Sequence, residues 1–401
     1  MTCWNHLLFS VALLTLAASP LTAEESVLAR LGAADWHRQK IQGQGITVAV
    51  LDNGFRGYRD LLGKSLPATV IARSFRADEN LEAKDSIHGL LCAEVVHTIA
   101  PKAKIVFANW EPDQPASFLK AVAWCREQGV TIFTCSIVMP GWSDGHGGGE
   151  VHQKLAKDLD GALFFASAGN LARRHWNGQF RGDERGLHQW QSGRTENMIR
   201  PWGGQPVSVE VTAANSSTYK ISLIDSKNKL VGREQTLSAG GITGTAVRFL
   251  PDDGVAYRLR LERLTGSGGD IRLVVLGARL DLTTDDGCMV FPGDGANAIA
   301  VGAVTTRDLL VPESSKGTVE PRVKPECVAI TPFPIKMRTT PFSGTSAAAP
   351  QAAGLAALMW SGDRSQKATV VRHRILESCI DLGATGPDVD TGYGRIQLPL
   401  P

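Results

Sequence analysis

Short apolar runs rich in β-branched residues alternate with helix-like segments over much of this 401-residue chain. Strands that are separated by single helices favour parallel pairing through right-handed crossovers. The alternation therefore predicts an α/β sandwich around a mostly parallel sheet. The expected strands are Thr47–Leu51, Lys104–Ala108, Thr131–Ser136, Leu163–Ala168 and Ala298–Val304. The expected helices are Leu90–Ile99, Phe118–Gln128, His152–Asp160, Gln351–Trp360 and Lys367–Glu377.

The alternation stops between residues 171 and 285. This segment far exceeds an ordinary connection of about 4–6 residues, so it should have structure of its own. Its β-branched runs alternate apolar and polar residues between Asn, Ser, Gly and Asp turns, as antiparallel strands do. They are Val207–Thr212, Tyr219–Asp225, Thr245–Leu250, Ala256–Leu264 and Ile271–Leu280. We expect an inserted antiparallel β-sandwich-like module, either as a structural addition or as a surface that guides substrates.

Ser346 lies among small residues in Phe342–Pro350, where an Ala-rich helix-like segment begins. Gly344 would let a substrate backbone approach Ser346 closely. A serine at a helix start has free backbone N–H groups and the positive dipole end beside it, which favour a developing oxyanion. Pro350 is expected near the first turn, where few N–H donors are needed. Taken alone, the segment also fits a buried helix with a Ser or Thr cap.

Two further segments favour the interpretation of Ser346 as a nucleophile over the interpretation of the segment as a capped buried helix. Gly45–Leu51 is a buried-strand pattern that ends at Asp52, and open α/β sheets place ligands at such strand ends. His88 stands at the apparent start of another helix. A serine needs a histidine to take its proton and a carboxylate to orient that histidine. Asp, His and Ser occur here in one of the known chain orders of such a triad.

With these motifs the chain resembles the subtilisin-like serine peptidases, the subtilase family, over Gly45 to about Asn170 and about Asp286 to Leu398. The resemblance implies a three-layer α/β sandwich. It also implies Asp52 as orienting acid, His88 as general base and Ser346 as nucleophile. Phe165–Asn170 resembles the turn that carries the oxyanion-hole amide, which assigns that role to Asn170. The segments at 298–304, 324–327 and 391–396 resemble framework segments of the family.

Several positions depart from the family pattern. The usual Asp-Thr-Gly is Asp-Asn-Gly at Asp52, a mild change because Asn also suits tight turns. The usual His-Gly-Thr-His start of the helix reads His-Gly-Leu-Leu from His88. Ser136 and Val138 lie where the family has the substrate-pairing Ser-Leu-Gly, so both are expected to bind substrate. Val138 replaces a glycine and adds bulk near the primary specificity pocket, which leaves the substrate preference open.

The N-terminal residues predict export. Leu7–Ala18 is apolar and is followed by small residues up to Ala23, which fits a secretory signal over residues 1–23. The segment carries no Lys or Arg before the apolar core, so an uncleaved anchor is the competing interpretation. We expect the mature chain to be secreted or periplasmic, without a membrane span. The formal net charge of +2 and the lack of a basic block give no indication of nucleic-acid binding.

The expected organisation is a signal peptide (1–23), a short lead-in (24–44), a first catalytic part (45–170), the inserted module (171–285) and a second catalytic part (286–401). The lead-in contains the helix-like Ser26–His37 but is too short to form a prodomain with its own core. An inserted module with its own core can often be excised, so we expect the catalytic parts to fold without it.

The cysteines allow two interpretations. Without Cys3 six remain, an even number in an exported chain, and disulfides are plausible. The apolar surroundings of Cys92, Cys125 and Cys135 instead favour buried thiols. No histidine spacing matches a metal site, so no catalytic metal or required cofactor is expected. Structural calcium is common in the family, and loop carboxylates could supply oxygens for it: Asp144, Asp285, Asp286, Asp388 and Asp390.

The sequence thus predicts a monomeric serine endopeptidase that hydrolyses proteins or peptides through an acyl-enzyme. Two alternatives remain. One is a catalytically silent subtilase scaffold that binds a protein partner through the β-rich insertion. The other is a narrowly specific processing protease whose cleft the insertion walls. The presence of Asp52, His88, Asn170 and Ser346 argues against the first, and Leu90 and Val138 keep the second open.

Overall fold

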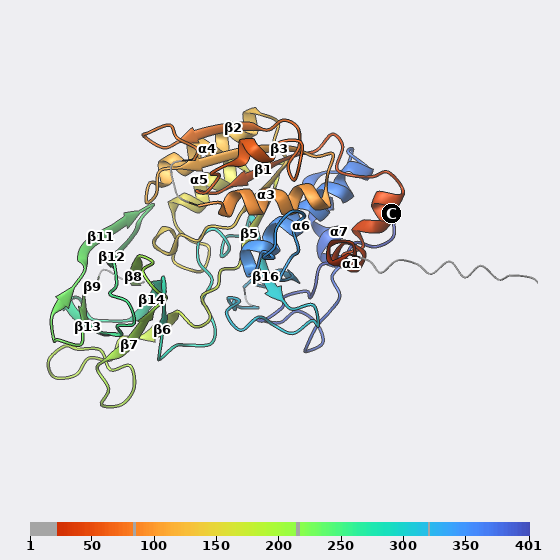
Figure 1. The fold of residues 1–401 in the computed structure, drawn as a ribbon. Helices are drawn as coiled ribbons and strands as arrows, with labels where there is room; N and C mark the ends of the chain where they lie inside the picture. Colours follow the sequence, from red (N-terminus) through yellow and green to blue (C-terminus); the bar gives the residue numbers. More distant parts are fainter. Residues whose placement is uncertain (1–21, 83–85, 214–216, 320) are drawn as a thin grey trace, which may run out of the picture.

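The protein folds around a seven-stranded sheet in which every neighbouring pair is parallel (Figure 1). The computed structural model describes residues 22–82, 86–213, 217–319 and 321–401, so nearly all of the expected signal segment 1–23 lies outside the described residues. The sheet order is β17-β16-β5-β4-β1-β3-β2. Its strands are β1 Thr47–Leu51, β2 Ile71–Phe75, β3 Lys104–Trp110, β4 Ile132–Cys135, β5 Leu163–Ser167, β16 Ala298–Val304 and β17 Cys327–Ile330.

The prediction of an α/β fold with a parallel sheet is therefore confirmed, and two edge strands were missed. β2 is largely exposed and reads Ile-Ala-Arg-Ser-Phe, without an apolar run. β17 has only four residues. Edge strands lack a neighbour on one side, so their sequences carry less of the apolar signal that identified the central strands.

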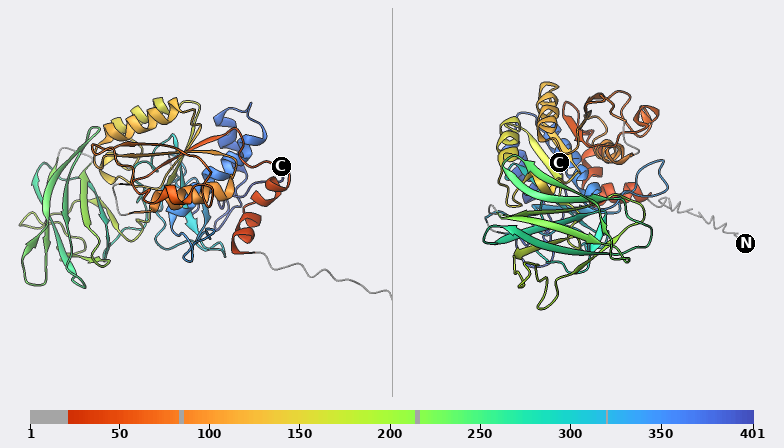
Figure 2. Two further views of the ribbon diagram at one scale, coloured as in Figure 1. Left: turned by 45° about the horizontal axis from the view of Figure 1, so that its top comes forward. Right: turned by 90° about the vertical axis from the view of Figure 1, so that its left-hand side faces the viewer.

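Helices cover both faces of the sheet (Figure 2, left). α3 His88–Ile99, α6 Thr345–Gly362 and α7 Ala368–Glu377 share one hydrophobic core with the sheet, and α4 Pro115–Glu127 and α5 Glu150–Asp158 share another. Within the described residues, none of the helices has both the length and the apolar character needed to cross a membrane. The remaining helices are α1 Ala23–Arg30, α2 Ala33–Arg38 and two 3-10 turns, Tyr58–Leu61 and Pro140–Trp142.

Strand β1 shows why its sequence is apolar at every position. Val48 and Val50 pack into the core shared with α3 and α6. Ala49 and Leu51 point to the opposite face and pack with α4 and α5. Because successive side chains of a strand alternate between faces, a sheet covered on both sides needs apolar residues throughout.

The expected helix over Ser26–His37 is broken in two. Gly32 adopts a left-handed conformation with φ of 76° and separates α1 from α2. A Cβ at Gly32 would lie 2.3 Å from the carbonyl oxygen of Leu398, so the close approach of the C-terminal segment also requires glycine. The backbone N–H of Leu398 donates to Leu31, at 2.9 Å, and ties the two ends of the described chain together.

The segment expected to be an inserted module contains two five-stranded antiparallel sheets, which form a lobe at one end of the molecule (Figures 1 and 2). Their orders are β10-β9-β13-β7-β15 and β11-β12-β8-β14-β6. The strands are β6 His175–Gln179, β7 Asn197–Pro201, β8 Val207–Ala213, β9 Thr218–Ile224, β10 Leu230–Val231, β11 Arg233–Ala239, β12 Ile242–Phe249, β13 Tyr257–Thr265, β14 Asp270–Leu276 and β15 Ala278–Leu280.

Strand β8 of the second sheet is buried on both faces. Val207, Val209 and Val211 of β8 pack into the core between the two sheets. The alternate residues Ser208 and Glu210 are 9% and 6% exposed, although a sandwich strand normally turns such residues to water. They face the α/β part of the protein, where Glu210 lines a cavity shared with its loops. Strand β8 therefore meets the α/β part through its polar face.

The disulfides that the even cysteine count made plausible are not formed in the described part of the chain. All six cysteines there are free thiols, of which Cys379 is partly exposed and the other five are buried: Cys92, Cys125, Cys135, Cys288 and Cys327. The interpretation as buried thiols, made for Cys92, Cys125 and Cys135, is the one that the structure supports.

Candidate active site

Asp52 is held rigidly at the end of β1. Its carboxylate is 1% exposed, and Oδ1 accepts hydrogen bonds from the backbone N–H groups of Asn53 (2.8 Å) and Gly54 (3.1 Å). The other oxygen, Oδ2, lies 2.7 Å from Nδ1 of His88. Hydrogen bonds from backbone amides favour the charged form of a buried carboxylate. Asp52 thus presents one fixed, negatively charged oxygen to His88.

His88 is the first residue of α3, and its ring is positioned by close packing. A Cβ on the next residue, Gly89, would lie 2.6 Å from Cβ of Asp52, so only glycine lets the helix approach β1 this closely. Phe342 contacts the ring edge-on, with the centroids 5.5 Å apart. Because the carboxylate of Asp52 can only accept, Nδ1 of His88 must carry the hydrogen. Nε2 is left with the lone pair that a general base needs.

The electrostatic surroundings of His88 also suit a base. Burial alone would lower the pKa of the ring, but the charge of Asp52 and the hydrogen bond to it outweigh burial and raise the pKa above its ordinary value of 6.5. The side chain is 30% exposed, so the ring is partly accessible from outside the protein.

Ser346 is the second residue of α6, and its backbone carbonyl lacks the usual helical donor. That donor would be the N–H of residue 350, which is a proline. The hydroxyl of Ser136 donates to this carbonyl at 3.1 Å, and the Cys92 thiol approaches it at 3.6 Å. Pro350 therefore lies inside the helix instead of near its first turn, and side chains of β4 and α3 supply the missing hydrogen bond.

Asn170 lies beside the start of α6. Its amide oxygen accepts from the backbone N–H and from the hydroxyl of Thr345, both at 3.1 Å. These two bonds fix the orientation of the amide, so its Nδ2 is free to donate elsewhere. Gly344 has a φ of 79°, which favours glycine, and a Cβ there would lie 3.1 Å from Nδ2, so the amide lies close to the residues before Ser346.

Val138 fills space on the other side of the Asn170 turn. Its Cγ1 would lie 3.3 Å from a Cβ on Gly169, and its side chain packs against a small core formed by Leu171, Val274, Cys288 and Val290. Val274 belongs to β14, so the inserted strands contribute to the packing behind this position. Ser136 points its hydroxyl to Ser346, as described above. The structure therefore brings the predicted residues of β1, β4, α3, α6 and the Asn170 turn to one place.

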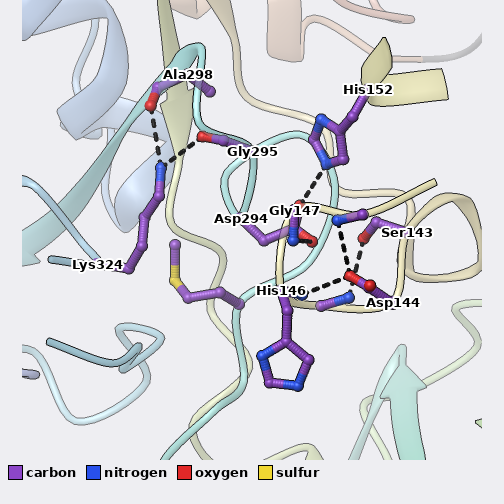
Figure 3. A network of polar contacts seen from close by, with 12 residues as sticks. Ser143, Asp144, His146, Gly147, His152, Asp294, Gly295, Ala298 and Lys324 are labelled. Atoms are coloured by element: carbon purple, nitrogen blue, oxygen red, sulfur yellow. Dashed lines mark hydrogen bonds and ion pairs between the residues drawn. The ribbon is translucent and has the colours of Figure 1, made fainter. Parts of the chain in front are cut away.

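The sequence pattern missed the residues that hold the loop over 143–149. The carboxylate of Asp294 accepts from the backbone of Gly147 (3.1 Å) and contacts Nε2 of His152 (2.9 Å) (Figure 3). Burial alone would raise the pKa of Asp294, but the hydrogen bond and charge of His152 lower it. Lys324 lies nearby and donates to the backbone carbonyls of Gly295 and Ala298 (Figure 3). A histidine and an aspartate 142 residues apart in sequence give no local signal for such a contact.

The described residues contain one group that could hold a metal ion, formed by Asp52, His88 and Cys92. Its ligand atoms lie within 4.8 Å of one another. Burial raises the pKa of the Cys92 thiol well above its ordinary value, and a protonated thiol is a poor ligand. Of the loop carboxylates that could supply oxygens to calcium, Asp144 and Asp388 accept hydrogen bonds from the backbone of their own loops. Such turns need no cation to be satisfied.

Comparisons with known proteins agree with this geometry. Residues 282–394 match the model described as the subtilase family. Similar solved structures include the CspB protease of Clostridium perfringens, with a TM-score of 0.64 and 15% identity over 93% of this chain and 97% of that one. They also include the prenylagaramide maturation protease PagA, with a TM-score of 0.51 and 14% identity over 92% of this chain and 96% of that one.

At such low identities the structural matches show a shared fold alone. No curated protein sequence matches the chain. The matched range 282–394 includes Ser346 and the start of α6, and the fold over nearly the whole chain is like that of the CspB protease. Residues 282–394 therefore resemble the subtilase family, and the chain as a whole shares the fold of these proteases.

Proposed function

We propose that the protein is an exported serine endopeptidase that cleaves peptide bonds through an acyl-enzyme. The contact between His88 and Asp52 carries this proposal, because it leaves Nε2 of His88 as a base at the site where α6 presents Ser346. In the proposed first step Ser346 Oγ attacks the carbonyl carbon, and its proton moves to Nε2 of His88. The imidazolium that forms is stabilised by the carboxylate of Asp52.

The next steps use the same groups. The former carbonyl oxygen becomes an oxyanion, for which the Nδ2 of Asn170 and the backbone N–H of Ser346 are the proposed donors. His88 then returns the proton to the leaving amine, and the C–N bond breaks. Water repeats the sequence on the acyl-enzyme and releases the acid product and free Ser346.

Active-site labelling tests the proposal directly. A fluorophosphonate should label the protein stoichiometrically, because it reacts with an activated serine. Ser346→Ala should abolish labelling and peptide hydrolysis while the protein stays folded, and His88→Ala should reduce hydrolysis to nearly the same residual level. Ser343→Ala offers a matched control, since Ser343 is an exposed serine on the same segment. Substantial hydrolysis by folded Ser346→Ala would refute the assignment.

A binding scaffold is the second candidate function. The observation that favours it is the cavity between the inserted strands and the α/β part, which could hold a segment of a protein partner. This candidate requires a protein that does not react with the fluorophosphonate yet binds a partner through that cavity. Labelling of Ser346 would eliminate it.

Export is proposed from the N-terminal sequence. Cleavage after Ala23 would remove Thr22, whose side chain caps α1 in a reciprocal arrangement with Glu25. Loss of such a cap costs about 1 kcal/mol, and α1 would still be held by the buried Val27 and Leu31. N-terminal sequencing of protein recovered from the periplasm or culture medium would locate the cleavage, and a full-length N-terminus in the membrane fraction would favour an anchor.

A further inference from the structure

The inserted strands and the α/β part enclose a cavity of about 470 Å³ next to the candidate active site. One wall comes from the loop after β3 and from residues 138–142, which follow β4. The opposite wall comes from β8, β11 and β12, which belong to the inserted sheet nearer the α/β part (Figure 1). Apolar side chains form much of the surface, among them Val138, Trp142 and Leu237.

The charges that line this cavity do not balance. Its lining contains three charged side chains, Asp113, Glu210 and Arg248. Arg248 donates to both carboxylate oxygens of Asp113, at 2.5 and 2.9 Å, and lies 3.8 Å from Glu210. One guanidinium thus serves two carboxylates, so the charged side chains of the lining sum to one negative charge.

Glu210 is the more buried of the two carboxylates, and it has only the more distant contact with Arg248. Asp113 is 58% exposed at its side chain and is solvated, whereas the side chain of Glu210 is 7% exposed. Glu210 accepts a hydrogen bond from the hydroxyl of Ser208, at 3.0 Å. Burial nevertheless raises its pKa above the ordinary value of 4.5. A buried carboxylate in this condition gains from a cationic partner, which relieves its desolvation.

The cavity lies within reach of a bound substrate. Val138 belongs to its lining, and Val138 is two residues beyond Ser136, whose hydroxyl contacts the Ser346 carbonyl. Two residues of extended chain span about 7 Å. An extended peptide at Ser346 could therefore place a side chain from a nearby position into the cavity.

We propose that this cavity is a substrate subsite that accepts a lysine or arginine side chain at one fixed position within a few residues of the cleaved bond. The aliphatic stem of that side chain would lie along the apolar wall, and its cationic head would donate to Glu210. The inference rests on the proposed peptidase function and adds a substrate class to it. It also gives the inserted strands a part in choosing substrates.

Matched peptides test the proposal. Each of the four positions on either side of the cleaved bond is scanned in turn with lysine against norleucine and with arginine against citrulline. At one position the basic residue should raise kcat/KM by about ten- to a hundred-fold, the range for a hydrogen bond to a charged group. Glu210→Gln should remove this preference while the norleucine peptides are cleaved as before. Glu234→Gln makes the same change on exposed β11, outside the cavity lining, and should leave the preference unchanged.

A second variant tests the subsite independently, in case Glu210→Gln does not fold. Gln235 is exposed on β11 and lines the cavity, so Gln235→Lys adds a positive charge with little risk to the fold. It should reduce the preference for basic residues. Fluorophosphonate labelling and melting temperatures are measured for every variant.

The outcomes separate the two proposals. Absence of both labelling and cleavage would refute the peptidase function. Labelled enzyme that shows no basic preference, prefers acidic residues, or keeps its preference in Glu210→Gln would overturn the subsite and leave the function standing. Labelled enzyme that cleaves none of the basic peptides would likewise overturn the subsite.

Discussion

The hydroxyl of Ser136 donates to the backbone carbonyl of Ser346, at 3.1 Å, and replaces the helical hydrogen bond that Pro350 cannot make. A proline inside a helix removes one donor and leaves a carbonyl one turn earlier without its partner. Here that carbonyl belongs to the proposed nucleophile. The end of β4 thus fixes the backbone of Ser346 relative to the central sheet.

This contact predicts that Ser136→Ala destabilises the protein and lowers turnover. An unsatisfied buried carbonyl costs about 1–3 kcal/mol, and the start of α6 should lose its fixed position. Ser136→Thr keeps the hydroxyl and serves as the control. Denaturant unfolding and kcat should both change in Ser136→Ala. Equal stability of wild type and Ser136→Ala would show that the Cys92 thiol alone satisfies the carbonyl.

The orientation of Asn170 predicts its contribution to turnover. Thr345 holds the amide oxygen, so Nδ2 is the atom that can donate to a developing oxyanion. Asn170→Ala should lower kcat by about two to three orders of magnitude, with only a few-fold change in KM, because the bond forms in the transition state. Thr345→Val removes one of the two orienting bonds and should have a smaller effect in the same direction. An unchanged kcat in folded Asn170→Ala would show that another group donates to the oxyanion.

The raised pKa of His88 predicts the pH dependence. A base must be neutral, so kcat/KM should fall as the pH drops through the His88 pKa, and this limb should lie above pH 6.5. The same shift stabilises the folded state fully below the unfolded-state pKa, and the stabilisation is lost as the pH rises through the raised folded value. Titration of His88 by NMR in the Ser346→Ala protein measures the pKa directly. Adding Asp52→Asn to the Ser346→Ala protein should lower the pKa of His88, because burial would then act without the opposing charge of Asp52.

The packing of Val138 predicts a preference for a small residue before the cleaved bond. Its side chain occupies the space beside Gly169, next to the proposed oxyanion donor. Val138→Gly should raise kcat/KM for peptides with leucine or phenylalanine at that position relative to alanine, by about ten-fold or more. Val138→Ala should give an intermediate ratio. If the ratio of kcat/KM for leucine or phenylalanine peptides to that for alanine peptides were the same in wild type, Val138→Ala and Val138→Gly, the side chain before the cleaved bond would not contact Val138.

The sequence predicted the central strands and proposed the residues of the candidate site, but it did not predict the contacts that hold those residues in place. β1 and β16 could be predicted because strands buried on both faces are apolar at every position. Asp52, His88 and Ser346 were identifiable from their local motifs and chain order. The contact from Ser136 to Ser346 joins residues 210 positions apart, and no local pattern encodes it.

The inserted strands show a second limit of the sequence. In β8 the alternation of valines with Ser208 and Glu210 is typical of a strand with one face in water. Both faces are buried, because the polar face meets loops of the α/β part. Excision of the insertion, which the sequence made plausible, would also remove Val274 from the small core behind Val138. We therefore expect such a truncated protein to be less stable than the sequence suggests.

The two-sided burial of β8 and β14 divides the inserted strands into two sets of positions that can vary independently. Substitutions at Val209 or Leu273 would alter the fold of the sandwich itself, because these side chains lie between its sheets. Substitutions at Glu210 or Leu276 would alter the wall beside the cleft and leave that interior intact. A lineage could therefore exchange one kind of target for another through alternate residues of the same strand, without rebuilding the domain that carries them.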